Sequence, residues 1–349
     1  SLHEDDETYR YAWMDMYSPI LHMEHDKFVE GNVLFADNFT LKTTGGNTTD
    51  TIAGFDLYAG YRNSHGIYSS FHSLTGFVQL SRSDVVVVDS GNHCLRVIER
   101  YENKTKDYSS NCKQPGYRDG EDALFWSPLK AIRNVKKENE ILITDFGNKR
   151  IRTYNIHYKE ASTLHRSYDY SYYCLVQENS TGNLYLTTSS NGIDKYDMGN
   201  FTISSVHESK ANTLSSPLIN SGEIAFLTFD KLLFIDGQAD SLKLFDLQKG
   251  ECSDMCIGNR SLCHWTQPSA LMVVKPSSVF VGQAKEIITI NGNKKISRVR
   301  TGGKYQVRVC LLSIAKRWDR VMTRSGPDFW SQLIWQSYSL RRSRVIVNR

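Results

Sequence analysis

The chain has 349 residues, of which 40% are hydrophobic and 23% are charged, and its formal net charge is +4. A chain of this length can bury a full core, and no apolar run approaches the length of a transmembrane helix. The positive charge is confined to residues 294–349, which hold 14 Lys and Arg but only two acidic residues. The preceding 293 residues hold 28 basic against 36 acidic residues, which argues against a nucleic-acid-binding surface.

The N-terminal segment, residues 1–14, precedes any repeat. Within it, residues 7–13 have strand character and are expected to add an edge strand to the last repeat, which would join the two ends of a ring. The chain begins at Ser1 rather than Met, as a processed ectodomain would.

A repeating unit of roughly 42 to 55 residues occupies residues 15–301 and recurs six times, a length that four strands and their turns require. Most units open with a bulky residue, two further positions and usually Pro. These openings are Met16-x-x-Pro19, Phe71-x-x-Leu74, Phe125-x-x-Pro128, Leu214-x-x-Pro217 and Trp265-x-x-Pro268. The gap between Pro128 and Pro217 contains a further, degenerate unit around residues 183–192.

Two units carry the same turn after an apolar strand, 56 positions apart. The residues of these turns and of the strands that follow them are Asp89, Gly91, Asn92, His93 and Arg96 in one unit, and Asp145, Gly147, Asn148, Arg150 and Arg152 in the other. Gly and Asn adopt positive φ at least cost, so the glycines are expected there. The carboxylates are expected to accept turn amides, and Arg96 with Arg150 or Arg152 to form ion pairs between blades.

These two segments resemble NHL repeats, the propeller repeat named for Asn-His-Leu. The resemblance implies an all-β fold, a six-bladed β-propeller over residues 15–301, in which the turn residues are structural. A second match supports the register, because Gly60-Tyr61-Arg62-Asn63-Ser64 corresponds to Gly116-Tyr117-Arg118-Asp119-Gly120. The alternative is a β-sandwich of ordinary hairpins.

Cysteines and sequons point to a secreted or cell-surface protein. Cys94 and Cys112 are symmetric about residue 103, so a hairpin turning there predicts a disulfide between them. The pairing of Cys174, Cys252, Cys256, Cys263 and Cys310 stays open. Asn-x-Ser/Thr sequons, predicted as glycosylation sites, occur at Asn38, Asn47, Asn103, Asn179, Asn200 and Asn259.

The C-terminal tail, residues 302–349, is basic, irregular and rich in Trp, and it is expected to lie outside the propeller. It fits a membrane-surface segment, an arm for an acidic partner, or an aberrant terminus that is not native folded sequence.

Catalysis is the less favoured reading. In the similar peptide-amidating lyases, zinc-binding histidines can directly follow the Pro of the inner strand. Here those positions hold other residues, namely Ile20, Thr75, Leu129, Leu218 and Ser269. His22 and His25 are three apart, so on one strand they diverge. We therefore predict no metal site and no cofactor.

The favoured function is an extracellular recognition or scaffold module that binds a protein or glycan through its loops, without catalysis. The alternative is a metal-dependent propeller enzyme, similar to the peptide-amidating lyases or to the lactonases.

Overall fold

The structure is a computed structural model. It describes residues 20–45, 48–55, 59–190, 192–207, 222–236, 241–254, 268–275, 278–283, 287–291 and 295–298. Residues 1–14 and 302–349 lie outside the described residues, as do Asn47, Asn259, Cys256, Cys263 and Cys310.

The described strands form six antiparallel sheets, each built from four strands that are consecutive in the chain. Sheets 1 to 3 consist of β1 (Ile20–His25), β2 (Val33–Asp37), β3 (Thr40–Gly45) and β4 (Thr48–Gly54); β5 (Leu74–Gln79), β6 (Asp84–Asp89), β7 (Cys94–Glu99) and β8 (Lys104–Asp107); and β9 (Pro128–Arg133), β10 (Glu140–Asp145), β11 (Arg150–Asn155) and β12 (Glu160–Arg166). Sheets 4 to 6 consist of β13 (Tyr172–Gln177), β14 (Leu184–Thr188), β15 (Ile193–Asp197) and β16 (Thr202–His207); β17 (Ile224–Thr228), β18 (Lys231–Asp236), β19 (Ser241–Asp246) and β20 (Glu251–Asp254); and β21 (Pro268–Lys275), β22 (Ser278–Gln283), β23 (Ile287–Asn291) and β24 (Lys295–Arg298). Three short 3-10 helices are η1 (Gly66–Tyr68), η2 (Ser90–Asn92) and η3 (Phe146–Asn148).

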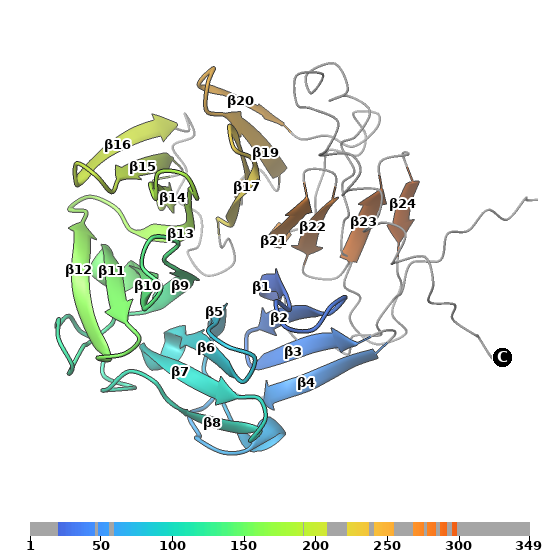
Figure 1. The fold of residues 1–349 in the computed structure, drawn as a ribbon, viewed down its shortest axis with the longest axis vertical. Coiled ribbons are helices and arrows are strands. Elements are labelled where there is room, and N and C mark those ends of the chain that lie inside the picture. Colours follow the sequence, from blue (N-terminus) through green and yellow to red (C-terminus); the bar gives the residue numbers. More distant parts are fainter. Residues whose placement is uncertain are drawn as a thin grey trace, which may run out of the picture.

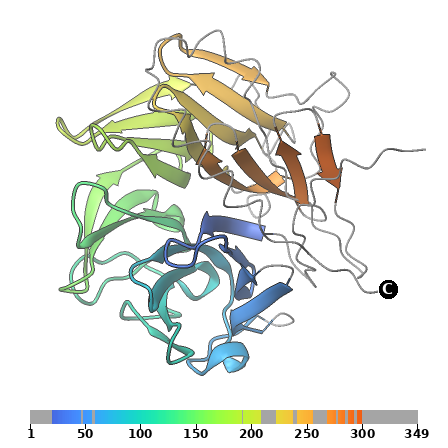
Figure 2. The same cartoon turned by 45° about the vertical axis from the view of Figure 1, so that its right-hand side comes forward.

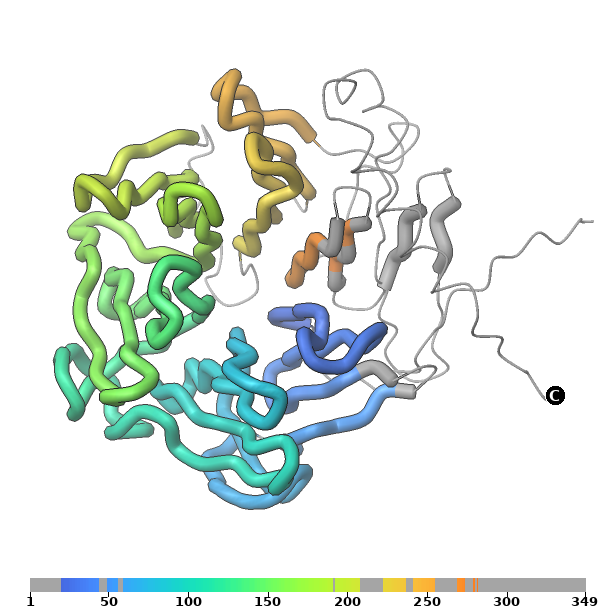
Figure 3. Tube along the Cα trace, viewed as in Figure 1, coloured from blue at the N-terminus to red at the C-terminus, as the bar shows by residue number. Residues whose placement is uncertain are grey.

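The sheets stand around a common centre like the blades of a propeller, with β1, β5, β9, β13, β17 and β21 innermost (Figure 1). The oblique view shows the same radial arrangement (Figure 2), and the trace follows it in chain order (Figure 3). The predicted all-β propeller is confirmed.

The count of six regular blades needs a correction. In sheets 1 to 5 every neighbouring pair of strands shares three or more register pairs, as β2 and β3 do. In sheet 6 the described pairing between β22 and β23 is Val281 with Ile288 alone. The described part of the chain therefore shows five regular blades and a sixth, thinly paired sheet.

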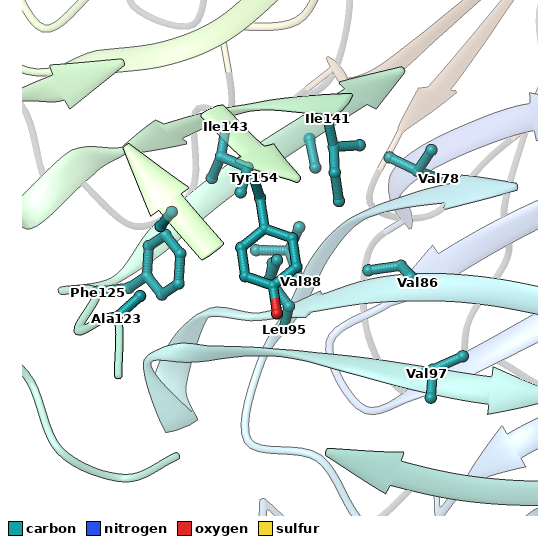
Figure 4. Close-up of a cluster of buried hydrophobic side chains, with 12 residues drawn as sticks. Val78, Val86, Val88, Leu95, Val97, Ala123, Phe125, Ile141, Ile143 and Tyr154 are labelled. Atoms are coloured by element: carbon teal, nitrogen blue, oxygen red, sulfur yellow. The ribbon is translucent and has the colours of Figure 1, made fainter. Parts of the chain in front are cut away.

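Apolar side chains between neighbouring sheets form the core. The run Val85–Val88 in β6 is continuous rather than alternating because β6 is covered on both faces. Val86 and Val88 pack against sheet 3, while Val85 and Val87 pack against sheet 1. Figure 4 shows the first of these clusters, in which Val86 and Val88 lie with Ile141, Ile143 and Tyr154.

The ends of the ring meet through side chains rather than through a shared sheet. Ile20 and Met23 of β1 pack against Ala270 and Met272 of β21. All four strands of sheet 6 come from residues 268–298, so among the described strands none is exchanged between the termini. Residues 7–13, the expected edge strand, lie outside the described residues.

Strand alternation gives the propeller two different ends. One end, which we call the motif end, carries the turns Ser90–Asn92 and Phe146–Asn148 and the points where connectors enter the inner strands. The opposite end, which we call the far end, carries the turns between first and second strands and between third and fourth strands. This distinction decides which surface residues can act together.

Candidate functional site

Asp89 organises the turn of sheet 2. Its Oδ1 accepts hydrogen bonds from the backbone N of His72 at 2.9 Å and of Ser73 at 3.3 Å. Its Oδ2 accepts from Asn92 Nδ2 at 2.8 Å and from Arg96 Nη1 at 3.1 Å. The carboxylate therefore ties the turn to the connector that enters β5.

Asp145 does the same in sheet 3. Its Oδ1 accepts from Trp126 N at 2.8 Å, and its Oδ2 accepts from Asn148 Nδ2 at 2.8 Å and Arg152 Nη1 at 2.7 Å. The two turns thus use equivalent residues, except that Ser73 N also donates to Asp89 whereas Ser127 N donates to His93. Asp236 and Lys243 form a weaker version in sheet 5, with 3.4 Å between Oδ2 and Nζ.

The expected ion pairs between blades form within each blade instead, and Arg152 rather than Arg150 pairs with Asp145. Arg96 and Arg152 pair with the aspartate of their own sheet, not with a neighbouring one. Each guanidinium also donates to the carbonyl of the preceding connector, Arg62 or Arg118, at 2.7 Å. It lies between two rings, Tyr61 and Phe71 in sheet 2, and Tyr117 and Phe125 in sheet 3. Arg150 takes no part in this pair.

The two turn glycines do not have positive φ, contrary to the prediction. The left-handed residues are His93, with φ of 58°, and Lys149, with φ of 54°. The glycines are needed because a ring covers them: an added Cβ would lie 2.5 Å from Cγ of His72 at Gly91 and 2.5 Å from Cγ of Trp126 at Gly147. His93 also links sheets, since its Nδ1 accepts from Ser127 N at 3.1 Å.

The loss of stability caused by alanine at Gly91 and at Gly147 should therefore change by different amounts when the covering ring is also removed. Gly91→Ala is expected to cost about 1–3 kcal/mol by overpacking, and His72→Ala should recover most of that loss. At Gly147 a backbone atom, Trp126 O, would also lie 2.7 Å from the new Cβ, so Trp126→Ala should recover little. Urea unfolding of the single and double variants measures both cycles; equal recovery at the two turns would contradict this account.

Cys94 and Cys112 form a disulfide. The hairpin register that predicted it is different, however, because Glu99 pairs with Lys104 and Arg96 pairs with Asp107. Beyond β8 the strand becomes irregular, with Tyr108 N and Ser109 N both donating to Leu95 O. Cys112 therefore reaches Cys94 from a loop, not from a directly opposite strand position.

Removing this disulfide should destabilise the protein substantially. The bridge closes a loop with a sequence separation of 18, which corresponds to about 3 kcal/mol of loop entropy in the unfolded chain. Replacing both cysteines with alanine and measuring unfolding in urea tests the magnitude. Non-reducing peptide mapping of secreted protein tests the bond itself, and two free thiols there would contradict it.

The described sequons differ in environment. Asn103, Asn179 and Asn200 are exposed, and all three lie in turns of the far end. Asn38 is half-buried at the motif end, where its Oδ1 accepts from Ser73 Oγ at 2.9 Å. Among the described cysteines, Cys174 is buried and free, and Cys252 is half-buried and free.

Sequence reasoning missed a polar cluster at the propeller axis. In each sheet, one inner residue lies opposite the penultimate position of the second strand. These equivalent residues are His22, Gly76, Lys130, Cys174, Glu223 and Ala270. We call the four with functional side chains, His22, Lys130, Cys174 and Glu223, the axial cluster.

Glu223 holds the axial cluster together. Its Oε1 accepts from Lys130 Nζ and contacts His22 Nδ1 at 3.2 Å, while its Oε2 lies 3.4 Å from Cys174 Sγ. Lys130 Nζ also donates to Leu21 O at 2.8 Å. All four side chains are buried, so the cluster is an internal polar network near the axis.

The local electrostatics follow from this packing. Burial alone would raise the pKa of Glu223, but the charge of Lys130 and the hydrogen bond with His22 outweigh it and lower that pKa. Burial and the neighbouring Glu223 charge raise the pKa of the Cys174 thiol, so the thiol stays neutral and poorly nucleophilic. His22 Nε2 has no hydrogen-bond partner among the described residues and lies 3.6 Å from Glu24 Oε1.

The strand positions expected to hold zinc ligands are not the ones that face the axis. Inner residues that face the axis lie two places after Ile20 in β1 and one place after Leu129 in β9, beyond the residues that directly follow the Pro. The third residue of the inner strands β1, β9 and β13 is His22, Lys130 and Cys174, respectively, so this shared position could have identified all three. The described residues contain no group of three or more His, Cys, Asp or Glu arranged to hold a metal ion.

Comparison with known proteins supports the fold. No family model and no curated protein matches the sequence. A chain of the nidogen/laminin complex is similar, with a TM-score of 0.54 and 12% identity over 80% of this chain and 97% of that chain. Virginiamycin B lyase from Staphylococcus aureus has a TM-score of 0.52 and 12% identity over 82% of this chain and 86% of that chain. These likenesses establish a β-propeller, a fold that serves both binding proteins and a lyase.

Proposed function

We propose that this chain is an extracellular recognition module of the NHL propeller type that binds a protein partner at its motif end, without catalysis. In this proposal residues 15–301 form one propeller, with sheet 6 as its sixth blade, and residues 302–349 lie outside it. The turn residues of sheets 2 and 3 then serve the fold, and the surface around them serves recognition.

The carrying observation is a group of exposed aromatic residues at the motif end of sheets 3 and 4. Trp126 is 50% exposed and Tyr168 is 76% exposed. Phe146 stacks on Tyr173 with 5.1 Å between ring centroids, next to the glycine that Trp126 covers. Large, rigid aromatic side chains are the commonest anchors of protein interfaces.

The disulfide and the exposed sequons support an extracellular location. The Cys94–Cys112 disulfide suits an oxidising compartment. Glycans at Asn103, Asn179 and Asn200 would lie at the far end, away from the proposed binding surface. Among the described residues there is no helix long and apolar enough to span a membrane.

Partner capture with matched aromatic variants tests this proposal. The glycosylated ectodomain, displayed as bait on extracellular extracts, should retain a protein that Trp126→Ala and Tyr168→Ala both lose. Tyr158→Ala is the control, because Tyr158 is similarly exposed but lies at the far end. Equal capture by all variants would refute binding at the motif end, and loss of capture after glycan removal from the partner would indicate a glycan ligand.

One observation favours the enzyme alternative. His22, Glu24 and Glu223 approach one another at the axis, which is where propeller enzymes place their chemistry. Metal analysis of purified protein and a lyase and hydrolase screen before and after chelation test it. Stoichiometric metal together with turnover that Glu223→Gln abolishes would replace the recognition proposal with a catalytic one.

A further inference from the structure

We propose that Lys149, Arg150 and Arg166 form a docking site for an acidic protein segment at the motif end of sheet 3. We call these three residues the cationic triplet. The inference rests on the proposed recognition function and specifies the chemistry of the partner.

The three cations are held together without a neutralising acid. Arg150 and Arg166 are directly opposite each other in the β11–β12 ladder, and Lys149 precedes Arg150. Within the described residues none of the three forms an ion pair, whereas Arg152 in the same strand forms two. Like charges directly opposite on neighbouring strands destabilise a sheet. We infer that this pair of arginines has a binding role that offsets the cost in stability.

The fold does not require cations at this place. The register that sets Arg150 opposite Asp145 sets Cys94 opposite Asp89 in sheet 2 and Ser241 opposite Asp236 in sheet 5. In sheet 2 the position is cross-linked by the disulfide. The same strand register thus forms with a cystine or a serine where sheet 3 holds an arginine.

Aromatic rings hold the cations in position. The guanidinium of Arg150 lies 3.7 Å from the centroid of Tyr117, and that of Arg166 lies 4.7 Å from the centroid of Tyr168. Lys149 Nζ donates to the carbonyls of Tyr168 and Asp169, both at 3.2 Å. Arg150 Nη1 donates to Asn148 O at 2.7 Å, which leaves its other N–H groups for a carboxylate. Stacked guanidinium groups also lose little entropy on binding.

An acidic protein segment fits this surface better than a sulfated glycan does. Three cations are few for a polyanion, and exposed rings of Trp126, Tyr117 and Tyr168 lie among or beside them. Arginine with tyrosine and tryptophan is the composition of protein-binding hot spots. Residues 1–293 contain more acidic than basic residues, so an acidic segment would be repelled by most of this surface and attracted to the cationic triplet.

A random copolymer of glutamate and tyrosine serves as the probe, with a heparin oligosaccharide as the competing class. The double variant Arg150→Ser/Arg166→Ser introduces the residue found at the Arg150 position in sheet 5. The control Arg82→Ser/Lys137→Ser removes two exposed cations in far-end turns of sheets 2 and 3. Binding is measured by calorimetry at near-physiological salt.

We expect the copolymer to bind wild type and control alike, and the double variant to bind about tenfold more weakly. Because opposed like charges are removed, the double variant should also melt at an equal or higher temperature. Equal binding by both double variants, or tighter binding of heparin than of the copolymer, overturns the inference. If the copolymer fails while capture still depends on Trp126 and Tyr168, the recognition proposal stands without this partner chemistry.

Discussion

Replacing Asp145 with alanine is expected to lower the free energy of unfolding by about 3–5 kcal/mol, because the change removes the fully buried carboxylate of Arg152 and leaves that buried guanidinium with only the partly exposed Asp119 as an acidic partner. Both side chains are fully buried, and Asp145 also accepts the backbone hydrogen bond from Trp126. Chemical denaturation followed by circular dichroism measures the change. The same substitution at Asp89 should have an effect of similar size, since its partners are equivalent.

Asp119 provides the matched control. Its Oδ1 contacts the same guanidinium, Arg152 Nη2, at 2.8 Å, but its side chain is 38% exposed. Asp119→Asn should therefore cost no more than about 1 kcal/mol. Arg152→Met combined with Asp145→Asn should be less destabilising than the sum of the single changes. A loss at Asp119 as large as that at Asp145 would contradict the role of burial.

Replacing Glu223 with glutamine is expected to cost about 3–5 kcal/mol near neutral pH. The change removes the charge that both Lys130 and His22 contact at the axis. Glu24→Gln is the control, because Glu24 is 24% exposed and contacts His22 more distantly, so its loss should be smaller. Lys130→Met added to Glu223→Gln should restore part of the stability.

The Glu223 contribution should also depend on pH. Its pKa is lowered in the folded protein, so the stabilisation is present above its ordinary value of 4.5 and is lost as the pH falls through the folded pKa. The difference in unfolding free energy between wild type and Glu223→Gln should therefore shrink below about pH 4. A difference that stays constant from pH 7 to pH 3 would show that the carboxylate charge is not what stabilises the axis.

The sequence by itself determined the all-β propeller fold but not the number of regular blades, because repetition and turn chemistry are local. Asp89 and Asp145, with glycine and asparagine at fixed offsets, predicted equivalent turns after buried strands, and the recurring strands predicted a propeller. The disulfide between Cys94 and Cys112 was also within reach, although the register behind it was wrong. The β7–β8 ladder itself has a different register, and an irregular stretch after β8 brings Cys112 to Cys94; nothing in the sequence marks either feature.

Only the tertiary structure decided why the turn glycines are needed and what lies at the axis. The rings over Gly91 and Gly147 belong to connectors 19 and 21 residues upstream, so no local pattern reveals the close approach. The axial cluster joins His22 to Glu223, which are 201 residues apart, through closure of the whole ring. Side chains separated by several blades meet only when all the intervening sheets have packed, and their identity follows no repeat.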